Sequence, residues 1–214
     1  MSNLMDYLDW RGDLTFREAP FNEVDNLILA QLVYVEFAGI VPAPGEEGTI
    51  TVKEACELFF AAHDRKEIME RVSMTKTAAF VLEKMAQTER FCNAQLFGYI
   101  NDISKEEQSQ FSVVCVRLDD KSIYVSFSGT DNTIVGWREN FNMGYLSETP
   151  GQLKAVDYLN HMVKEDWKKI RVGGHSKGGN ETQLAALVFA DKINAAYNFD
   201  GQGFPPDVVE QLKD

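Results

Sequence analysis

The sequence has few of the residues that build disulfide frameworks or metal sites. It contains three cysteines and three histidines in 214 residues. The cysteines, Cys56, Cys92 and Cys115, are odd in number and scattered, which indicates a reducing compartment and no metal site. The first residues contain no basic segment followed by an apolar one, so no signal peptide is evident. We therefore expect a cytoplasmic protein.

Long apolar runs and an excess of positive charge are also absent. No apolar stretch reaches the roughly 20 residues that a membrane-spanning helix needs. The 33 acidic and 21 basic residues give a formal net charge of −12, which argues against nucleic acid or an anionic membrane surface as a partner. Apolar residues make up 44% of the chain, as in globular proteins, and the length suffices for one domain with a sizeable core.

The first 94 residues have mainly helical patterns. Asn22 is placed to cap a helix that runs to about Phe37, and Thr51 with Glu54 has the spacing of a capping box for a second helix. A third helical stretch spans about residues 75–87. This N-terminal region (residues 1–94) either packs beside a sheet or covers the functional site as a lid or cap, and both interpretations stay open.

From Gln95 the apolar period changes to that of strands. Three segments are rich in β-forming residues: 96–103, 111–118 and 123–127. Residues 119–121 have the composition of a hairpin turn. From Ile123 onward, strand and helix patterns alternate, which predicts parallel strands joined by crossover helices. We therefore predict one α/β domain over residues 1–214, with a mainly parallel sheet in residues 95–214 flanked by helices.

The strongest motif lies in residues 168–180, KKIRVGGHSKGGN. Gly174, Ser176 and Gly178 spell G-x-S-x-G between a short β-rich run and a helical pattern. Such a turn holds the serine outward, and the two glycines let strand and helix approach without Cβ clashes. The backbone N–H of Lys177 lies at the helix N-terminus, where it is suited to bind a developing oxyanion.

These glycines allow two other interpretations. A phosphate-binding loop is excluded, because Gly179 and Asn180 stand where Lys-Ser/Thr is required. The remaining alternative is a tight strand-to-helix turn in which Ser176 is incidental. The strand pattern before the motif and the helical pattern after it favour a nucleophilic serine.

A second oxyanion donor is expected from a loop that follows an earlier strand. The segment 123–127 ends in Ser128-Gly129-Thr130-Asp131, the best candidate in the chain. The backbone N–H or the hydroxyl of Thr130 would donate a hydrogen bond to the same oxygen as the Lys177 N–H. Asp131 would support the loop. The alternative is an ordinary turn with an Asx-type cap at Asp131. Residues 137–140 are expected to buttress this loop.

Together, residues 124–130 (YVSFSGT) and 174–178 (GHSKG) resemble the class 3 lipases of the α/β-hydrolase superfamily. The chain resembles a bacterial lipase-like family more closely in four segments: DYLDWRGD (6–13), FNEVD (21–25), GHSKGGN (174–180) and NFDG (198–201). The resemblance implies an α/β-hydrolase fold with Ser176 as nucleophile and with Lys177 and Thr130 as oxyanion donors.

A serine hydrolase also needs a histidine base and an acid, and both follow the serine in this superfamily. No histidine follows His175, which adjoins the nucleophile and is interpreted as packing or loop support. His63 reads as a solvated residue at a helix end, and His161 lies in a helix at the far end of the sheet. Asp200 is the candidate acid; the alternative is a turn or a helix cap.

The missing histidine leads to a further expectation about the chain. Residues 195–199 would form an unprotected edge strand if the domain ended at Asp214. We therefore expect a C-terminal segment beyond this chain that carries further strands and the histidine. The alternatives are a base from another chain, or a fold that keeps the turn without catalysis.

The sequence thus predicts an enzyme of the lipase or esterase type that needs no cofactor. It would cleave a small-molecule ester or acyl substrate through an acyl-enzyme on Ser176. A thioesterase or a peptidase would use the same parts. The alternative from another class is a non-catalytic module that holds an acyl or peptide-like ligand.

Overall fold

The computed structural model describes residues 3–70, 73, 75–131, 133–144, 146 and 148–211, so Met1 and Asp214, the ends of the predicted domain, lie outside the described residues. In chain order the elements are α1 (Leu4–Arg11), α2 (Glu23–Leu32), β1 (Ile50–Thr51), α3 (Val52–Ala62), α4 (Arg65–Glu70), α5 (Ala78–Ala86), β2 (Gln95–Ser104), β3 (Ser109–Arg117), β4 (Ile123–Phe127), α6 (Ile134–Asn142), α7 (Pro150–Met162), β5 (Ile170–His175), α8 (Lys177–Val188), β6 (Ile193–Phe199) and α9 (Pro206–Gln211).

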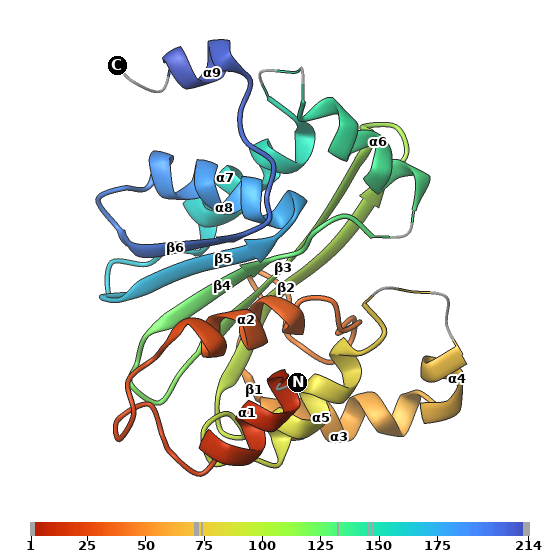
Figure 1. Cartoon of the computed structure of the whole chain (residues 1–214), viewed down its shortest axis with the longest axis vertical. Coiled ribbons are helices and arrows are strands. Elements are labelled where there is room, and N and C mark those ends of the chain that lie inside the picture. The colour runs from red at the N-terminus through yellow and green to blue at the C-terminus, as the bar shows by residue number, and fades with distance from the viewer. Residues whose placement is uncertain are drawn as a thin grey trace.

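A mixed sheet forms the centre of the molecule (Figure 1). In the described part of the chain it has six strands, in the order β1-β2-β3-β4-β5-β6. The pairs β1/β2, β2/β3 and β3/β4 are antiparallel, whereas the pairs β4/β5 and β5/β6 are parallel. The predicted α/β class is confirmed, but the prediction of a mainly parallel sheet is wrong.

Connection length explains the mixed sheet. A short turn joins β3 to β4, where the Leu118 N–H donates to Ser122 O and Lys121 takes a positive φ of 65°. Such a turn reverses the chain and leaves only antiparallel pairing. Helices α7 and α8 precede β5 and β6, and these crossovers give the parallel pairs that were predicted from Ile123 onward.

Helices cover both faces of the sheet (Figure 1). On the α7 and α8 face, Val125 and Val172 pack with Ala185 in one buried cluster. On the opposite face, Tyr124 packs with residues of α1, α2, α3 and α5 in a second cluster. Because successive strand residues point to opposite faces, neighbours such as Tyr124 and Val125 belong to different cores.

The N-terminal helices begin where the capping signals predicted. Asn22 caps α2 in a capping box with Asp25, and Thr51 caps α3 in a capping box with Glu54. The predicted end of the first of these helices at Phe37 is wrong, because α2 ends at Leu32. The apolar spacing continues past that point because residues 33, 35 and 37, which lie in non-helical segments, enter the same core.

Helix α2 also bonds directly to the sheet. Ser126 Oγ of β4 donates to Leu29 O over 3.0 Å. The N-terminal region therefore packs against a face of the sheet through α2. None of the helices in the described part of the chain is long and apolar enough to cross a membrane.

Candidate functional site

Ser176 lies between β5 and α8 in a conformation that few residues adopt. Its φ is 54° and its ψ is −123°, a combination that costs a residue with a Cβ about 1–3 kcal/mol. Its backbone is held at both ends, because Ser176 N donates to Phe199 O over 2.8 Å and Ser176 O accepts from Gly179 N over 2.9 Å. The sharp strand-to-helix turn predicted for residues 174–178, called the serine turn below, is present.

The glycines of the serine turn allow its close packing. A Cβ added at Gly174 would lie 2.5 Å from the carbonyl carbon of Gly178 and 2.7 Å from Phe127 O. A Cβ added at Gly178 would contact the same Phe127 oxygen even more closely. The end of β4, the end of β5 and the first turn of α8 therefore meet at distances that only glycine permits.

The loop after β4 lies directly against Ser176. A Cβ added at Gly129 would lie 3.3 Å from Ser176 Cβ and 2.6 Å from His175 O. Gly129 N donates to the Tyr34 hydroxyl over 2.8 Å, so that N–H is already engaged. Burial raises the pKa of Tyr34 to about 12, which keeps this hydroxyl neutral. The structure thus brings together the serine turn and the loop predicted to supply the second donor.

Within that loop the two predicted residues have different contacts. The Thr130 hydroxyl donates to Asn140 Oδ1 of α6 over 3.1 Å, which leaves the Thr130 backbone N–H as the loop's candidate donor. Asp131 Oδ1 accepts from Thr133 N over 2.8 Å and from the Thr133 hydroxyl. Asp131 is therefore the Asx-type cap of a turn. The hydrogen bond that Asn140 accepts from Thr130 agrees with the predicted buttress in residues 137–140.

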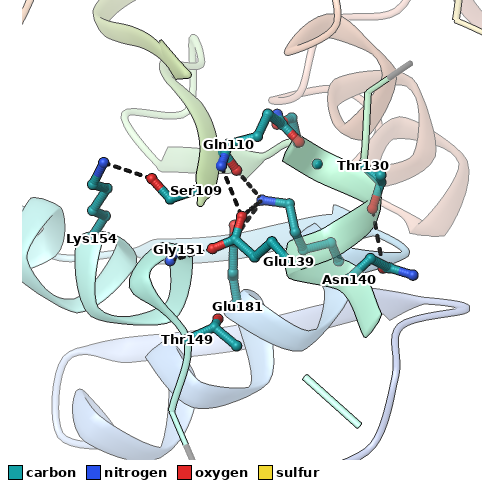
Figure 2. A network of polar contacts seen from close by, with 12 residues as sticks. Ser109, Gln110, Thr130, Glu139, Asn140, Thr149, Gly151, Lys154 and Glu181 are labelled. Atoms are coloured by element: carbon teal, nitrogen blue, oxygen red, sulfur yellow. Dashed lines mark hydrogen bonds and ion pairs between the residues drawn. The ribbon is translucent and has the colours of Figure 1, made fainter. Parts of the chain in front are cut away.

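A buried cluster of charged side chains adjoins the serine turn through Lys177, and Figure 2 shows two of its members, Glu139 and Glu181. Lys177, Glu139 and Glu181 have no exposed surface. Lys177 Nζ lies 2.8 Å from Glu181 Oε1 and 3.7 Å from Glu139 Oε2, and it also donates to Gln110 O. The backbone of Lys177 thus begins α8 beside Ser176, while its side chain ties α8 to α6 and to the start of β3.

The two carboxyl groups of this cluster have different partners. Glu139 accepts backbone N–H groups at both oxygens, from Gln110 over 2.8 Å and from Gly151 over 2.6 Å. Glu181 accepts from Lys177, but its Oε2 has no partner among the described residues. Burial raises the pKa of Glu181 to about 7; Lys177 opposes this shift and the charge of Glu139 adds to it.

None of the three histidines hydrogen-bonds to Ser176. His63 Nδ1 contacts Phe59 O at the end of α3, and exposed His161 lies near Asp157 at the end of α7. His175 ends β5, and its register partner is Phe199. No hydrogen bond reaches the Ser176 hydroxyl from any residue that the structure describes.

Asp200 is next to the serine turn in the fold but does not complete a triad. It follows Phe199, the residue whose carbonyl accepts from Ser176 N, and it takes a positive φ of 51°. Its side chain is exposed and makes no hydrogen bond within the described part of the chain. Asp200 therefore lies in a turn, in which Gly201 N donates to Asn198 Oδ1.

Several polar residues near the site were not singled out from the sequence. Asn180 of α8 donates to Gln202 O over 3.0 Å and accepts from Gln152 Nε2 over 2.6 Å. Gln202 in turn donates to Asn140 Oδ1. One signal was available for the buried cluster: Lys177 and Glu181 have i, i+4 spacing on the predicted helix.

A cavity of about 220 Å³, whose lining is both polar and apolar, opens beside the loop after β4. Its lining includes Tyr34, Gln110, Ser128, Gly129 and Asp131. Because Gly129 packs against Ser176, this cavity lies close to the serine turn. Its lining of hydroxyl, amide and carboxylate groups is suited to the polar part of a small ligand.

Comparison with known proteins gives a family but no activity. A family model described as Mbeg1-like matches residues 85–213, which is more than half of the chain. No curated protein and no solved structure matched the chain. The matched residues include β2 to β6, the loop after β4 and the serine turn.

This match corrects two predictions. The Mbeg1-like family is not a class 3 lipase family, so the assignment to lipases or to a lipase-like family is wrong. The prediction of lipase-type or esterase-type hydrolysis fails with it, because the family is not a hydrolase family. The thioesterase, peptidase and ligand-binding alternatives gain no support from the match either.

Proposed function

The chain belongs to the Mbeg1-like family, and we propose that it is an enzyme whose reacting group is the hydroxyl of Ser176. The hydroxyl oxygen would attack an electrophilic centre of a small-molecule substrate, at which a neighbouring oxygen gains negative charge as the new bond forms. This role does not include ester cleavage, and no cofactor enters the step. A cytoplasmic location stays a prediction from the sequence.

The observation that carries the proposal is the backbone conformation of Ser176. A serine with a φ of 54° and a ψ of −123° is strained, and strain of this kind is concentrated at functional sites. Glycine would adopt the same angles without penalty, so the serine side chain is present there at an energetic cost. A strained serine supported by glycines two residues before and after it is typical of an exposed nucleophile.

In this proposal two backbone N–H groups, those of Lys177 and Thr130, would stabilise the developing charge. Lys177 is the first residue of α8, so its N–H has no acceptor within its own helix and lies at the positive end of the helix dipole. Thr130 lies in the loop that packs on Ser176, and its hydroxyl is occupied by Asn140. Donors held this way stabilise charge that appears only during the reaction.

The surrounding fold is consistent with this role. We infer that β3 to β6, with α7 and α8, form a core of the α/β-hydrolase type, because the serine turn joins the middle one of the three parallel strands to the helix that follows it. The hydroxyl proton passes to solvent in this arrangement, since no described side chain hydrogen-bonds to Ser176 Oγ. The reaction is therefore expected to be slow compared with one assisted by histidine.

Covalent labelling tests the proposal. The folded protein is treated with a fluorophosphonate, and the adduct is located by peptide mass spectrometry. We expect the adduct on Ser176 and its loss in Ser176→Ala. Ser128, which lies in the neighbouring loop and is buried, supplies the matched control: Ser128→Ala keeps the adduct.

Two results would contradict the proposed role of Ser176. If fluorophosphonate leaves Ser176 unmodified in protein shown to be folded by circular dichroism, the serine is not a nucleophile and the proposal fails. An adduct spread over exposed serines and tyrosines, unchanged by Ser176→Ala, has the same meaning.

A further inference from the structure

The charges beneath the serine turn do not balance unless a proton is bound there. Two carboxyl groups, Glu139 and Glu181, share one ammonium group, Lys177, and all three side chains are fully buried. With every group ionised, the cluster would carry one uncompensated negative charge away from water. Burying an unpaired charge is far costlier than protonating it.

Hydrogen bonds indicate which carboxyl group stays ionised. Both oxygens of Glu139 accept backbone N–H donors, from Gln110 and Gly151, so a proton on either oxygen would displace a hydrogen bond. A carboxyl group that accepts several such bonds is stabilised in its charged form. Glu139 is therefore the anion that balances Lys177.

The same reasoning leaves Glu181 as the group that binds the proton. Its Oε1 accepts from Lys177 Nζ, whereas its Oε2 is buried and lacks any partner among the residues described. Helix α7 packs against the other oxygen, because a Cβ added at Gly151 would lie 2.8 Å from Glu181 Oε1. Three ionisable groups act on Glu181: Lys177 of α8, Glu139 of α6, and Tyr34 from the segment after α2.

We propose that Glu181 is a positioning residue that holds a proton beneath Ser176, and that with Lys177 and Glu139 it forms an anchor for the serine turn. The anchor is neutral when Glu181 is protonated and carries one negative charge when the proton leaves. Because Lys177 is the residue next to Ser176, that charge arises close to the N–H that would bind an oxyanion. Protonation of Glu181 therefore regulates the reactivity of Ser176.

The effect on reactivity rests on the proposed role of Ser176, whereas the bound proton does not. Two measurements separate them. The first follows the side-chain carboxyl ¹³C resonances of glutamate-labelled protein against pH, with Glu181→Gln used to assign the Glu181 signal.

We expect Glu181 to titrate near pH 7, in line with the pKa of about 7 that its burial produces. In Glu139→Gln the titration moves to lower pH, because the nearby negative charge is gone and Lys177 then pairs with Glu181 alone. A Glu181 signal that titrates near its ordinary value of 4.5 in the unaltered protein overturns the anchor. So does a midpoint that Glu139→Gln leaves unchanged.

The second measurement compares rates of fluorophosphonate labelling at Ser176 in the unaltered protein and in Glu181→Gln, whose neutral amide mimics the protonated carboxyl group. At about pH 5.5 the two rates are expected to agree, and at about pH 8.5 the variant is expected to be faster by on the order of threefold or more. Glu57→Gln removes a carboxylate from the exposed face of α3 and is expected to leave the ratio near one at both pH values.

The outcomes distinguish the two proposals. A Glu181 titration near pH 7 without any labelling of Ser176 would retain the bound proton and reject the proposed nucleophile. Labelling at Ser176 whose rate ratio stays at one across the same pH range, as with Glu57→Gln, would retain the nucleophile and reject the regulation by Glu181.

Discussion

Lys177 Nζ donates to Glu181 Oε1 over 2.8 Å on one helix, and both side chains are completely buried. Pairs with this i, i+4 spacing usually lie on helix surfaces, where they contribute little to stability. Here the pair lies beneath a strained serine and shares its ammonium group with Glu139 of another helix. The serine turn is thus held by the polar contacts of Lys177 as well as by close packing at its glycines.

Removing the ammonium group is expected to destabilise the protein strongly. Lys177→Met would leave the Glu139 carboxylate buried without its cation, a change that typically costs about 3–5 kcal/mol. Lys154→Met is the matched control, because Lys154 pairs with Asp102 and Glu107 at the surface and should contribute less than about 1 kcal/mol. Urea unfolding measures both free energies.

The double variant Lys177→Met with Glu139→Gln should recover part of that loss, because no unpaired carboxylate then remains at position 139. Equal losses for Lys177→Met and Lys154→Met would show that the buried cluster does not anchor the fold.

The pH dependence of stability should report Glu181. Its pKa in the folded protein is about 7, above the ordinary value of 4.5 expected in the unfolded chain. The folded state therefore binds the proton more tightly, and the stabilisation is complete at low pH and is lost as pH rises from about 4.5 through about 7. Relative to Glu181→Gln, the free energy of unfolding should fall by about 3 kcal/mol across that range.

Urea unfolding of both proteins at several pH values gives this difference and cancels the contributions of the other carboxylates. A difference that stays constant over the range, or that grows in favour of the unaltered protein as pH rises, contradicts the assignment.

The strain at Ser176 predicts an unusual effect of glycine. Ser176→Gly should be more stable than Ser176→Ala by about 1 kcal/mol or more, because only glycine adopts a φ of 54° and a ψ of −123° without penalty. At Ala61, an exposed helical position, Ala61→Gly should instead lower the free energy of unfolding by about 1 kcal/mol. If glycine is no better than alanine at position 176, the turn is not strained.

Histidine should not contribute to the reactivity of Ser176. His63→Gln, His161→Gln and His175→Gln are each expected to leave the labelling rate at Ser176 within about twofold, because no histidine hydrogen-bonds to that hydroxyl. The rate is measured at neutral pH by intact-protein mass spectrometry. A loss of tenfold or more in one of the three variants would identify that histidine as a base and refute proton release to solvent.

Local sequence signals predicted the features that depend on a few neighbouring residues. Asn22 and Thr51 cap helices because their side chains bond to backbone N–H groups within three residues. The serine turn follows from glycines at fixed offsets from Ser176. The predicted β4 segment, residues 123–127, agrees with the observed strand at both ends.

Features that depend on distant residues were missed or misread. The predicted helix over residues 22–37 was too long because burial in a shared core gave turn residues an apolar spacing similar to that of a helix. The burial of Lys177 depends on Glu139 and Gln110, which come from other elements. Local sequence patterns therefore do not predict that the Lys177 side chain points into the protein. The prediction of ester hydrolysis was wrong for a related reason. The turn motif predicts where a serine lies, but it does not specify which other groups take part in its chemistry.

The most direct test of the account is the rate at which fluorophosphonate modifies Ser176 in the folded protein, compared with the rate for the same serine in the urea-unfolded chain. If the turn and its backbone donors activate the hydroxyl, the folded protein should react at least about tenfold faster, a threshold below the roughly 100- to 1,000-fold that one well-placed donor supplies. A folded rate equal to or below the unfolded rate would contradict the assignment of Ser176 as the reacting group.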